Sequence, residues 1–364
     1  MHVLMLISCF SVMLSQDIRT HHTLACIWDF DKTLTPGYMQ TPLFQEYGID
    51  EATFWTEVNR LPEIYARRGV HVSKDTVYLN HLLSYVKNGP LKGLSNKKLR
   101  ELGALVPLCP GVPEVFDKLR DYAKKIGEEY NLDIDLEHYI VSTGLAEMIR
   151  GSAVAEHVDG IYGCEFIEQP LPPHYTEQDE LALDLPSEIS QVGVMVDNTI
   201  KTRFIFEINK GSNKNPEIDV NAVVRAQDRR VPFENMVYVA DGPSDVPVFS
   251  VVRKGGGFAY AVYSENKRAE RRQNDTLQES KRVNGYGPND YRDTQFTFDW
   301  LCMRIEDMIV RIDKARNFAV ESNVAQPPRH LHDRSDARGS TRSAAPSVNP
   351  LEEPDSSPEQ PSLL

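Results

Sequence analysis

Three short apolar runs, each of which ends at a polar side chain, constrain the fold of this chain most strongly. They are Leu24–Trp28 before Asp29, His138–Val141 before Ser142, and Met236–Ala240 before Asp241. Each run is continuous and rich in β-branched or aromatic residues, as expected for a strand that is buried on both faces of a sheet. A fourth run, Phe258–Tyr263, follows three glycines and predicts another strand.

Helical patterns separate these runs and indicate the fold class. After the turn at Pro110-Gly111, apolar residues recur on one helix face: Val112, Val115, Phe116, Leu119, Tyr122 and Ile126. Alternating strand and helix signals predict an α/β fold with a parallel sheet covered by helices on both faces. A later apolar stripe, from Phe298 to Ile312, predicts a helix docked on the same core.

Residues 38–107 do not follow this alternation. They have a mostly helical pattern, in which Leu79, Leu82 and Val86 share one face and Ser95 is placed to cap the next helix. A segment of this length is too long for a loop in a compact domain. We therefore expect a helical domain at 38–107, inserted into a sheet domain formed by residues 22–37 and 108–318.

The two ends of the chain differ in composition from the two domains predicted between them. In the N-terminal extension, residues 1–21, the apolar run Val3–Leu14 is too short to span a bilayer. No Lys or Arg precedes it and no A-x-A site follows, so we expect a cytoplasmic protein, with export by a signal peptide as the alternative. Residues 319–364 contain no aromatic residue but seven Pro and eight Ser, which predicts a disordered tail, and a partner for this tail stays open.

The overall composition excludes several classes of protein. The chain has 40 Lys and Arg against 53 Asp and Glu, a net charge of −13, which disfavours nucleic-acid binding. Its five cysteines are scattered and form no C-x-x-C pair, so we expect neither a disulfide framework nor a zinc site. No stretch reaches 18 apolar residues, and we expect no membrane span.

The polar residues at the strand ends predict a reactive site. Parallel sheets bind ligands at the carboxyl ends of their strands, so Asp29, Asp31, Ser142, Asp241 and Asp245 should share one crevice. Four carboxylates repel one another unless a cation lies among them. Mg²⁺ fits, because it takes oxygen ligands and often bridges to a substrate phosphate.

The spacing of the first motif, Asp29-Phe30-Asp31-Lys32-Thr33, suggests a division of labour. Just past a strand, residues i and i+2 can point the same way, so both carboxylates face one reacting centre. One can attack phosphorus, and the other can protonate the leaving oxygen and later activate water. A lysine should offset the negative charge of the phosphoryl group, and Lys201 and Lys210 are the candidates.

These residues resemble the four ordered motifs of the haloacid-dehalogenase-like (HAD) hydrolase superfamily, especially its phosphoserine-phosphatase-like branch. The resemblance covers roughly residues 24–263 and rests on DFDKT, Ser142, a lysine and DGPSD. It implies a Rossmann-like core and a mobile cap at 38–107. It gives no reason for Trp28, which is bulkier than the residue usual before the nucleophile.

The resemblance also implies a role for each motif residue. Asp29 would be the nucleophile, Asp31 the general acid and base with its carbonyl also on Mg²⁺, and Thr33 a brace for the loop. Asp241 and Asp245 would bind Mg²⁺ or its waters, together with Asp29. The phosphoryl group would be bound by a hydroxyl, Ser142 in preference to Thr143, and by a lysine, Lys201 in preference to Lys210.

The expected activity is Mg²⁺-dependent hydrolysis of a small phosphorylated metabolite through an aspartyl-phosphate. Two alternatives stay open. A metal-independent dehalogenase would use Asp29 but gain nothing from Asp31, Asp241 and Asp245. A catalytically weak binding or scaffold protein would keep the fold and recruit partners through its tail. The sequence does not reveal the substrate, and phosphoserine is only a family analogy.

Overall fold

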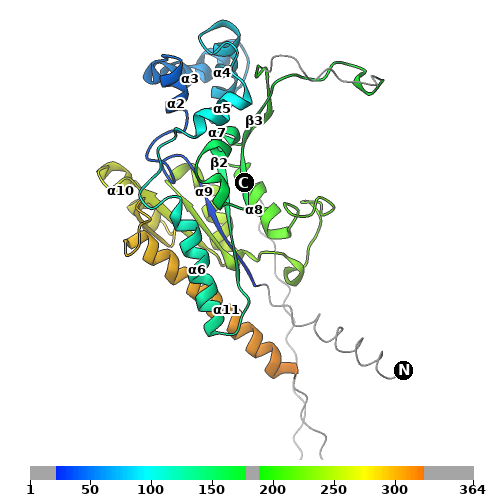
Figure 1. The fold of residues 1–364 in the computed structure, drawn as a ribbon, viewed down its shortest axis with the longest axis vertical. Helices are drawn as coiled ribbons and strands as arrows, with labels where there is room; N and C mark the ends of the chain where they lie inside the picture. The colour runs from blue at the N-terminus through cyan, green and yellow to red at the C-terminus, as the bar shows by residue number, and fades with distance from the viewer. Residues whose placement is uncertain (1–21, 178–187, 324–364) are drawn as a thin grey trace, which may run out of the picture. The chain divides into compact units, whose positions relative to one another are not determined.

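The computed structural model describes residues 22–177 and 188–323. The predicted N-terminal extension, with its apolar run, and residues 324–364 of the predicted tail lie outside the described residues. Figure 1 shows the arrangement of the elements, with the helices that follow the first strand gathered at one end of the sheet.

A seven-stranded sheet forms the centre of the fold, in the order β4-β3-β2-β1-β5-β6-β7. All neighbouring strands pair in parallel except β3 and β4, which pair antiparallel. The strands are β1 Thr23–Trp28, β2 Asp135–Leu145, β3 Gly160–Ile167, β4 Gln191–Val194, β5 Met236–Ala240, β6 Phe258–Tyr263 and β7 Gly285–Pro288. The predicted α/β fold class is confirmed.

The strand β1 occupies the middle of the sheet, and alternate side chains enter two different cores. Leu24, Cys26 and Trp28 join a cluster on one face, whereas Ala25 and Ile27 join a cluster on the other. Both faces of β1 are therefore buried, which explains why its sequence is a continuous apolar run rather than an alternating one.

Helices cover both faces of the sheet, as predicted. Apolar residues of α6 (Glu114–Glu129) and α11 (Phe296–Asn323) pack into the first cluster. Those of α8 (Lys201–Lys210), α9 (Val246–Lys254) and α10 (Arg268–Glu279) pack into the second. In Figure 1, α6 and α11 run along the sheet on the same side.

Four helices lie within residues 38–107: α2 Thr41–Glu46, α3 Glu51–Ala66, α4 Val77–Asn88 and α5 Asn96–Gly103. The side chain of Ser95 accepts a hydrogen bond from the backbone N–H of Lys98, which satisfies a free donor at the start of α5. The helix α5 packs closely on α7 (Ala146–Gly151). At Gly103 the two helices are so close that a Cβ atom would lie 2.0 Å from the carbonyl oxygen of Met148, so only glycine fits there.

The remaining short elements are 3₁₀ turns at Ala155–His157, Tyr175–Glu177, Ala226–Asp228, Phe233–Asn235 and Pro243–Asp245. Among the described residues, no helix combines the length and apolar character that a bilayer crossing requires.

Two predicted boundaries are wrong. Strand β2 continues past Val141 to Leu145, with an irregular register between these residues, so Ser142 and Thr143 lie inside the strand rather than beyond it. Helix α11 continues to Asn323, five residues into the predicted tail. No Gly or Pro occurs between residue 319 and Pro327, so nothing in the local sequence stops the helix at 318.

The structure explains Trp28. Its indole N–H donates to Nδ1 of the buried His138, 3.2 Å away on β2, and Nε2 of His138 lies 3.1 Å from the carbonyl oxygen of Phe116 on α6. Burial lowers the pKa of His138 to about 3, so the ring is neutral, with Nδ1 accepting and Nε2 donating. The indole therefore joins β1, β2 and α6 immediately before Asp29.

We predict that Trp28→Phe lowers the free energy of unfolding by about 1–3 kcal/mol, because it leaves Nδ1 of His138 buried without a donor. Urea unfolding measures this loss. His138→Phe and the double variant complete a double-mutant cycle, and the double variant should lose less than the sum of the two single losses. Simple additivity would contradict a coupling between these side chains.

Candidate active site

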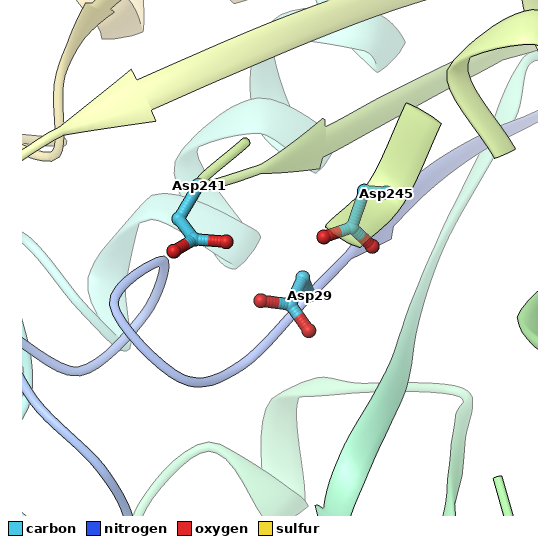
Figure 2. Close-up of side chains that lie close together, drawn as sticks. All are labelled: Asp29, Asp241 and Asp245. Atoms are coloured by element: carbon cyan, nitrogen blue, oxygen red, sulfur yellow. The ribbon is translucent and has the colours of Figure 1, made fainter. Parts of the chain in front are cut away.

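Three carboxylates from two neighbouring strand ends meet in one place. Asp29 follows β1, and Asp241 and Asp245 follow β5. One carboxylate oxygen from each residue lies within 4.8 Å of the other two. Figure 2 shows Asp29 facing both Asp241 and Asp245. The predicted convergence of motifs that are more than 200 residues apart is thus present in the structure.

The side chain of Lys201 lies between two of these carboxylates. Its Nζ donates to Oδ1 of Asp29 at 2.7 Å and to Oδ1 of Asp245 at 2.6 Å. Lys201 is the first residue of α8 and is only 1% exposed. A buried lysine needs such partners because an isolated ammonium is strongly destabilised away from water.

The alternative lysine, Lys210, lies at the other end of α8. Its Nζ donates to the backbone carbonyls of Val220 and Ala222, at 2.6 and 2.7 Å, and holds the segment that follows the helix. Lys201 is therefore the lysine that the structure brings to the carboxylates.

Burial and mutual repulsion alter the acid strength of the cluster. Burial, together with Asp245, raises the pKa of Asp29, although Lys201 opposes this shift. Burial and the charges of Asp29 and Asp245 raise the pKa of Asp241 to about 7. Burial lowers the pKa of Lys201, but Asp245 and Asp29 outweigh it and the net shift is upward. The lysine thus stays charged while the carboxylates compete for positive charge.

Asp31 and Thr33 lie in the loop that follows β1. Oδ1 of Asp31 accepts from the backbone N–H of Met39 at 2.7 Å, which orients the carboxyl group. Burial, and then the charge of Asp29, raise the pKa of Asp31 to about 8. The hydroxyl of Thr33 donates to Oδ2 of Asp29 at 3.1 Å, while its carbonyl accepts from Tyr291, so Thr33 links the loop to the nearby carboxylate.

The two candidate hydroxyls on β2 occupy different positions. The side chain of Ser142 is buried, and its Oγ accepts from the backbone N–H of Gly144 at 3.0 Å. Thr143 lines a cavity of about 380 Å³ together with Asp29, Asp31, Lys201 and Asp241, whereas Ser142 does not line it. The irregular register of β2 places Thr143, rather than Ser142, on the cavity wall.

Sequence reasoning missed several residues of this cavity, which include Lys32, Tyr38, Asp75, Asn198 and Gln273. Lys32 has the left-handed φ of 57°, and its Nζ donates to the hydroxyl of Tyr38 at 2.9 Å. Nδ2 of Asn198 donates to Asp75 at 3.2 Å and so joins the helical insertion to the segment before α8. Only Lys32, inside the quoted DFDKT motif, carried a sequence signal.

Tyr238 was also missed, although it lies in the predicted run Met236–Ala240. Its hydroxyl donates to Oδ1 of Asp245 at 2.5 Å. Ser244 donates to the other oxygen of Asp245 at 2.9 Å. These bonds and Lys201 hold the Asp245 carboxylate in place.

The donor set fits a divalent cation. Asp29, Asp241 and Asp245 offer hard oxygen ligands, and the single lysine bonded to them leaves the three carboxylates with a net negative charge of about two. Asp241 makes no hydrogen bond to Lys201, so the lysine does not occupy its oxygens and they can serve as metal ligands.

Mg²⁺ at a fixed concentration of about 100 times its Kd at pH 8 should raise the free energy of unfolding at that pH by about 2.7 kcal/mol. Thermal unfolding measures this shift, which should be larger at pH 8 than at pH 6, because protons occupy Asp241 below its pKa of about 7. Asp241→Asn should lose most of the shift, whereas Asp228→Asn, on an exposed turn, should keep it. An equal shift in both variants would contradict a metal site at Asp241.

Comparison with known proteins yields one sequence relative and a set of solved structures. No family model matches the chain. The relative is an uncharacterized protein of Borreliella burgdorferi, 36% identical over 286 residues, which cover 78% of this chain and 96% of the relative.

The solved structures similar to this chain include a phosphoserine phosphatase in apo form, with 14% identity, TM-score 0.44, and coverage of 74% of this chain and 96% of that chain. They also include a HAD family hydrolase from Salmonella enterica serovar Typhi, with 12% identity, TM-score 0.43, and coverage of 69% and 65%. At these scores the similarities establish no activity.

The sheet topology and the gathering of the motif residues agree with the resemblance stated from the sequence. The identity to the Borreliella protein extends over nearly all of that protein. This chain therefore belongs to the same protein family as the uncharacterized protein of Borreliella burgdorferi.

Proposed function

We propose that this chain is a HAD-type, Mg²⁺-dependent phosphatase that hydrolyses a small-molecule phosphomonoester through an aspartyl-phosphate. The observation that supports this most strongly is the position of Asp29. Its carboxylate is held by Lys201 and Thr33 and lines a cavity shared with Asp31 and Asp241. A fixed carboxylate beside a second carboxyl group and a cation suits nucleophilic attack at phosphorus.

In the first step, an oxygen of Asp29 forms a bond to phosphorus as the bond from phosphorus to the ester oxygen breaks. The proton of Asp31 passes to the leaving alcohol. In the second step, Asp31 accepts a proton from water, the hydroxide attacks phosphorus, and the bond to Asp29 breaks to release phosphate. The same carboxyl group thus acts as acid and then as base.

Lys201 keeps its positive charge throughout and offsets charge on the phosphoryl oxygens. Thr143, which lines the cavity, is the hydroxyl placed to donate to the phosphoryl group, while Ser142 braces the backbone at Gly144. Asp29, Asp241 and Asp245, with the carbonyl of Asp31, would hold Mg²⁺, whose chemistry is to neutralise charge on the phosphoryl group.

The helical segment 38–107 acts in this proposal as the cap over the sheet domain of residues 22–37 and 108–318. Asp75 and Tyr38 of the segment line the same cavity as Asp29, and Asn198 bonds Asp75 across it. Selectivity for the alcohol part of the substrate then depends on the cap.

Asp29→Asn should abolish turnover and phosphoenzyme formation, because an amide cannot act as the nucleophile. A screen of phosphorylated metabolites with Mg²⁺ measures the activity, and phosphate release and acid-stable labelling of the protein are the two readouts. Wild-type rates in Asp29→Asn would contradict the proposal. Activity that survives EDTA, on halogenated acids rather than esters, would favour the dehalogenase instead.

The dependence of activity on pH tests the role of Asp31. Its protonated form donates to the leaving oxygen, so kcat/KM should fall as pH rises past the Asp31 pKa of about 8. Asp31→Asn should lose a factor of about 10²–10⁴ in rate and should lack this alkaline limb. A limb that persists unchanged in Asp31→Asn would assign the titration to another group.

A further inference from the structure

A second cavity, of about 360 Å³, adjoins the one that contains Asp29. The two cavities share Asp31, Tyr38, Asp75 and Thr143. Asp31, the proposed acid for the leaving alcohol, is thus on the boundary between them. Such a volume lies in the range of ligand pockets in proteins.

Aromatic rings form one wall of this second cavity. The ring centroids of Tyr38 and Trp55 lie 5.5 Å apart, and those of Trp55 and Tyr78 lie 5.8 Å apart. Val58 adds an aliphatic surface beside them. The rings contact one another, so they present a continuous apolar surface rather than a slot.

The polar groups of two of these rings are already engaged. The hydroxyl of Tyr78 donates to the carbonyl oxygen of Thr143 at 2.7 Å. The indole N–H of Trp55 lies 3.4 Å from Oε1 of Glu51, on the same helix. What these two side chains offer to a ligand is therefore mainly ring surface.

Gln40, which also lines the cavity, offers little to a ligand. The residue is 2% exposed, and its Oε1 has almost no accessible surface and accepts no hydrogen bond from any described residue. The amide oxygen is therefore not part of the surface that the cavity presents.

Two charged side chains of the cavity, Lys74 and Asp75, are exposed, and Asp75 already accepts from Asn198. The third, Asp31, lies at the boundary with the first cavity. The wall away from Asp31 thus offers mainly apolar rings, which suits a ring better than a small zwitterion.

We infer that this cavity binds the leaving alcohol of the substrate, and that this alcohol carries a planar ring. The ring lies on the surface formed by Tyr38, Trp55 and Tyr78. The inference rests on the proposed phosphatase function, and it narrows the substrate to ring-bearing phosphomonoesters.

The test measures binding to the full-length Asp29→Asn protein with Mg²⁺ by calorimetry, so that turnover is not needed. The ligands are a nucleoside 5′-monophosphate (ring with donors), phenyl phosphate (ring alone), and glycerol 3-phosphate and O-phosphoserine (no ring). Phenyl phosphate should bind about tenfold more tightly than glycerol 3-phosphate, since contact with aromatic rings favours it. The nucleotide should also bind more tightly than glycerol 3-phosphate.

A matched pair of variants in the same background tests the ring surface. Trp55→Leu should abolish the preference for a ring, whereas Tyr65→Leu, on the same helix but outside the cavity, should keep it.

The outcomes distinguish this inference from the proposed function. Equal binding of ring and non-ring ligands, or an equal loss in Trp55→Leu and Tyr65→Leu, would overturn the inference, while turnover of any phosphomonoester by the wild type would still support a phosphatase. A ring preference without turnover of any phosphomonoester would support the cavity as a ring site and refute the proposed reaction.

Discussion

The rest of the site depends on the buried contact of Lys201 with Asp29 and Asp245. Removing one partner of a buried ion pair leaves an uncompensated charge, at a cost of about 3–5 kcal/mol. Here one ammonium serves two carboxylates, and Asp241 stands close to both without a bond to the lysine. The cluster can therefore reach neutrality only by taking up protons or a cation, and burial and mutual repulsion raise the pKa values of Asp29 and Asp241. A divalent cation competes with protons for the same carboxylate oxygens, so the affinity for the metal depends on pH.

The sheet makes this arrangement possible. Because β1 and β5 are parallel neighbours, their carboxyl ends lie side by side and place Asp29 beside Asp241 and Asp245. Trp28 fixes the end of β1 from the other side, through its bond to His138 on β2. Residues that are distant in sequence thus hold Asp29 in place through backbone pairing and one buried side-chain bond. Bringing the carboxylates together costs free energy, and burial of apolar side chains in the two cores that pack against β1 offsets this cost.

The sequence predicted those secondary-structure elements that a local residue pattern determines. The buried strands β1, β5 and β6 show as continuous apolar runs, and the convergence of their ends follows from parallel pairing. The end of β2 could not be predicted, because an irregular register at Ser142 and Thr143 depends on pairing with β3. Apolar pattern alone also could not identify Gln40, whose unpaired oxygen is defined only by the helices around it. Lys201 was favoured over Lys210 because it precedes a predicted helical run, the position that the family resemblance gives to its lysine, but its two carboxylate partners lie 172 and 44 residues away along the chain.

Lys32 shows how the loop after Asp29 departs from an ordinary turn. A left-handed conformation at a residue with a Cβ atom costs about 1–2 kcal/mol, and glycine would avoid this cost. The conformation places the ammonium on the hydroxyl of Tyr38 and 4.4 Å from the centre of its ring, in the same cavity as Asp29 and Asp241. Burial lowers the pKa of Lys32, but Tyr38 and Asp241 outweigh it and raise the pKa overall. Strain of this kind persists where the surroundings hold it, and it concentrates at functional sites. The loop therefore places a second positive charge, beside that of Lys201, on the wall of a cavity that also contains Asp29, Asp31 and Asp241, where it favours an anionic ligand.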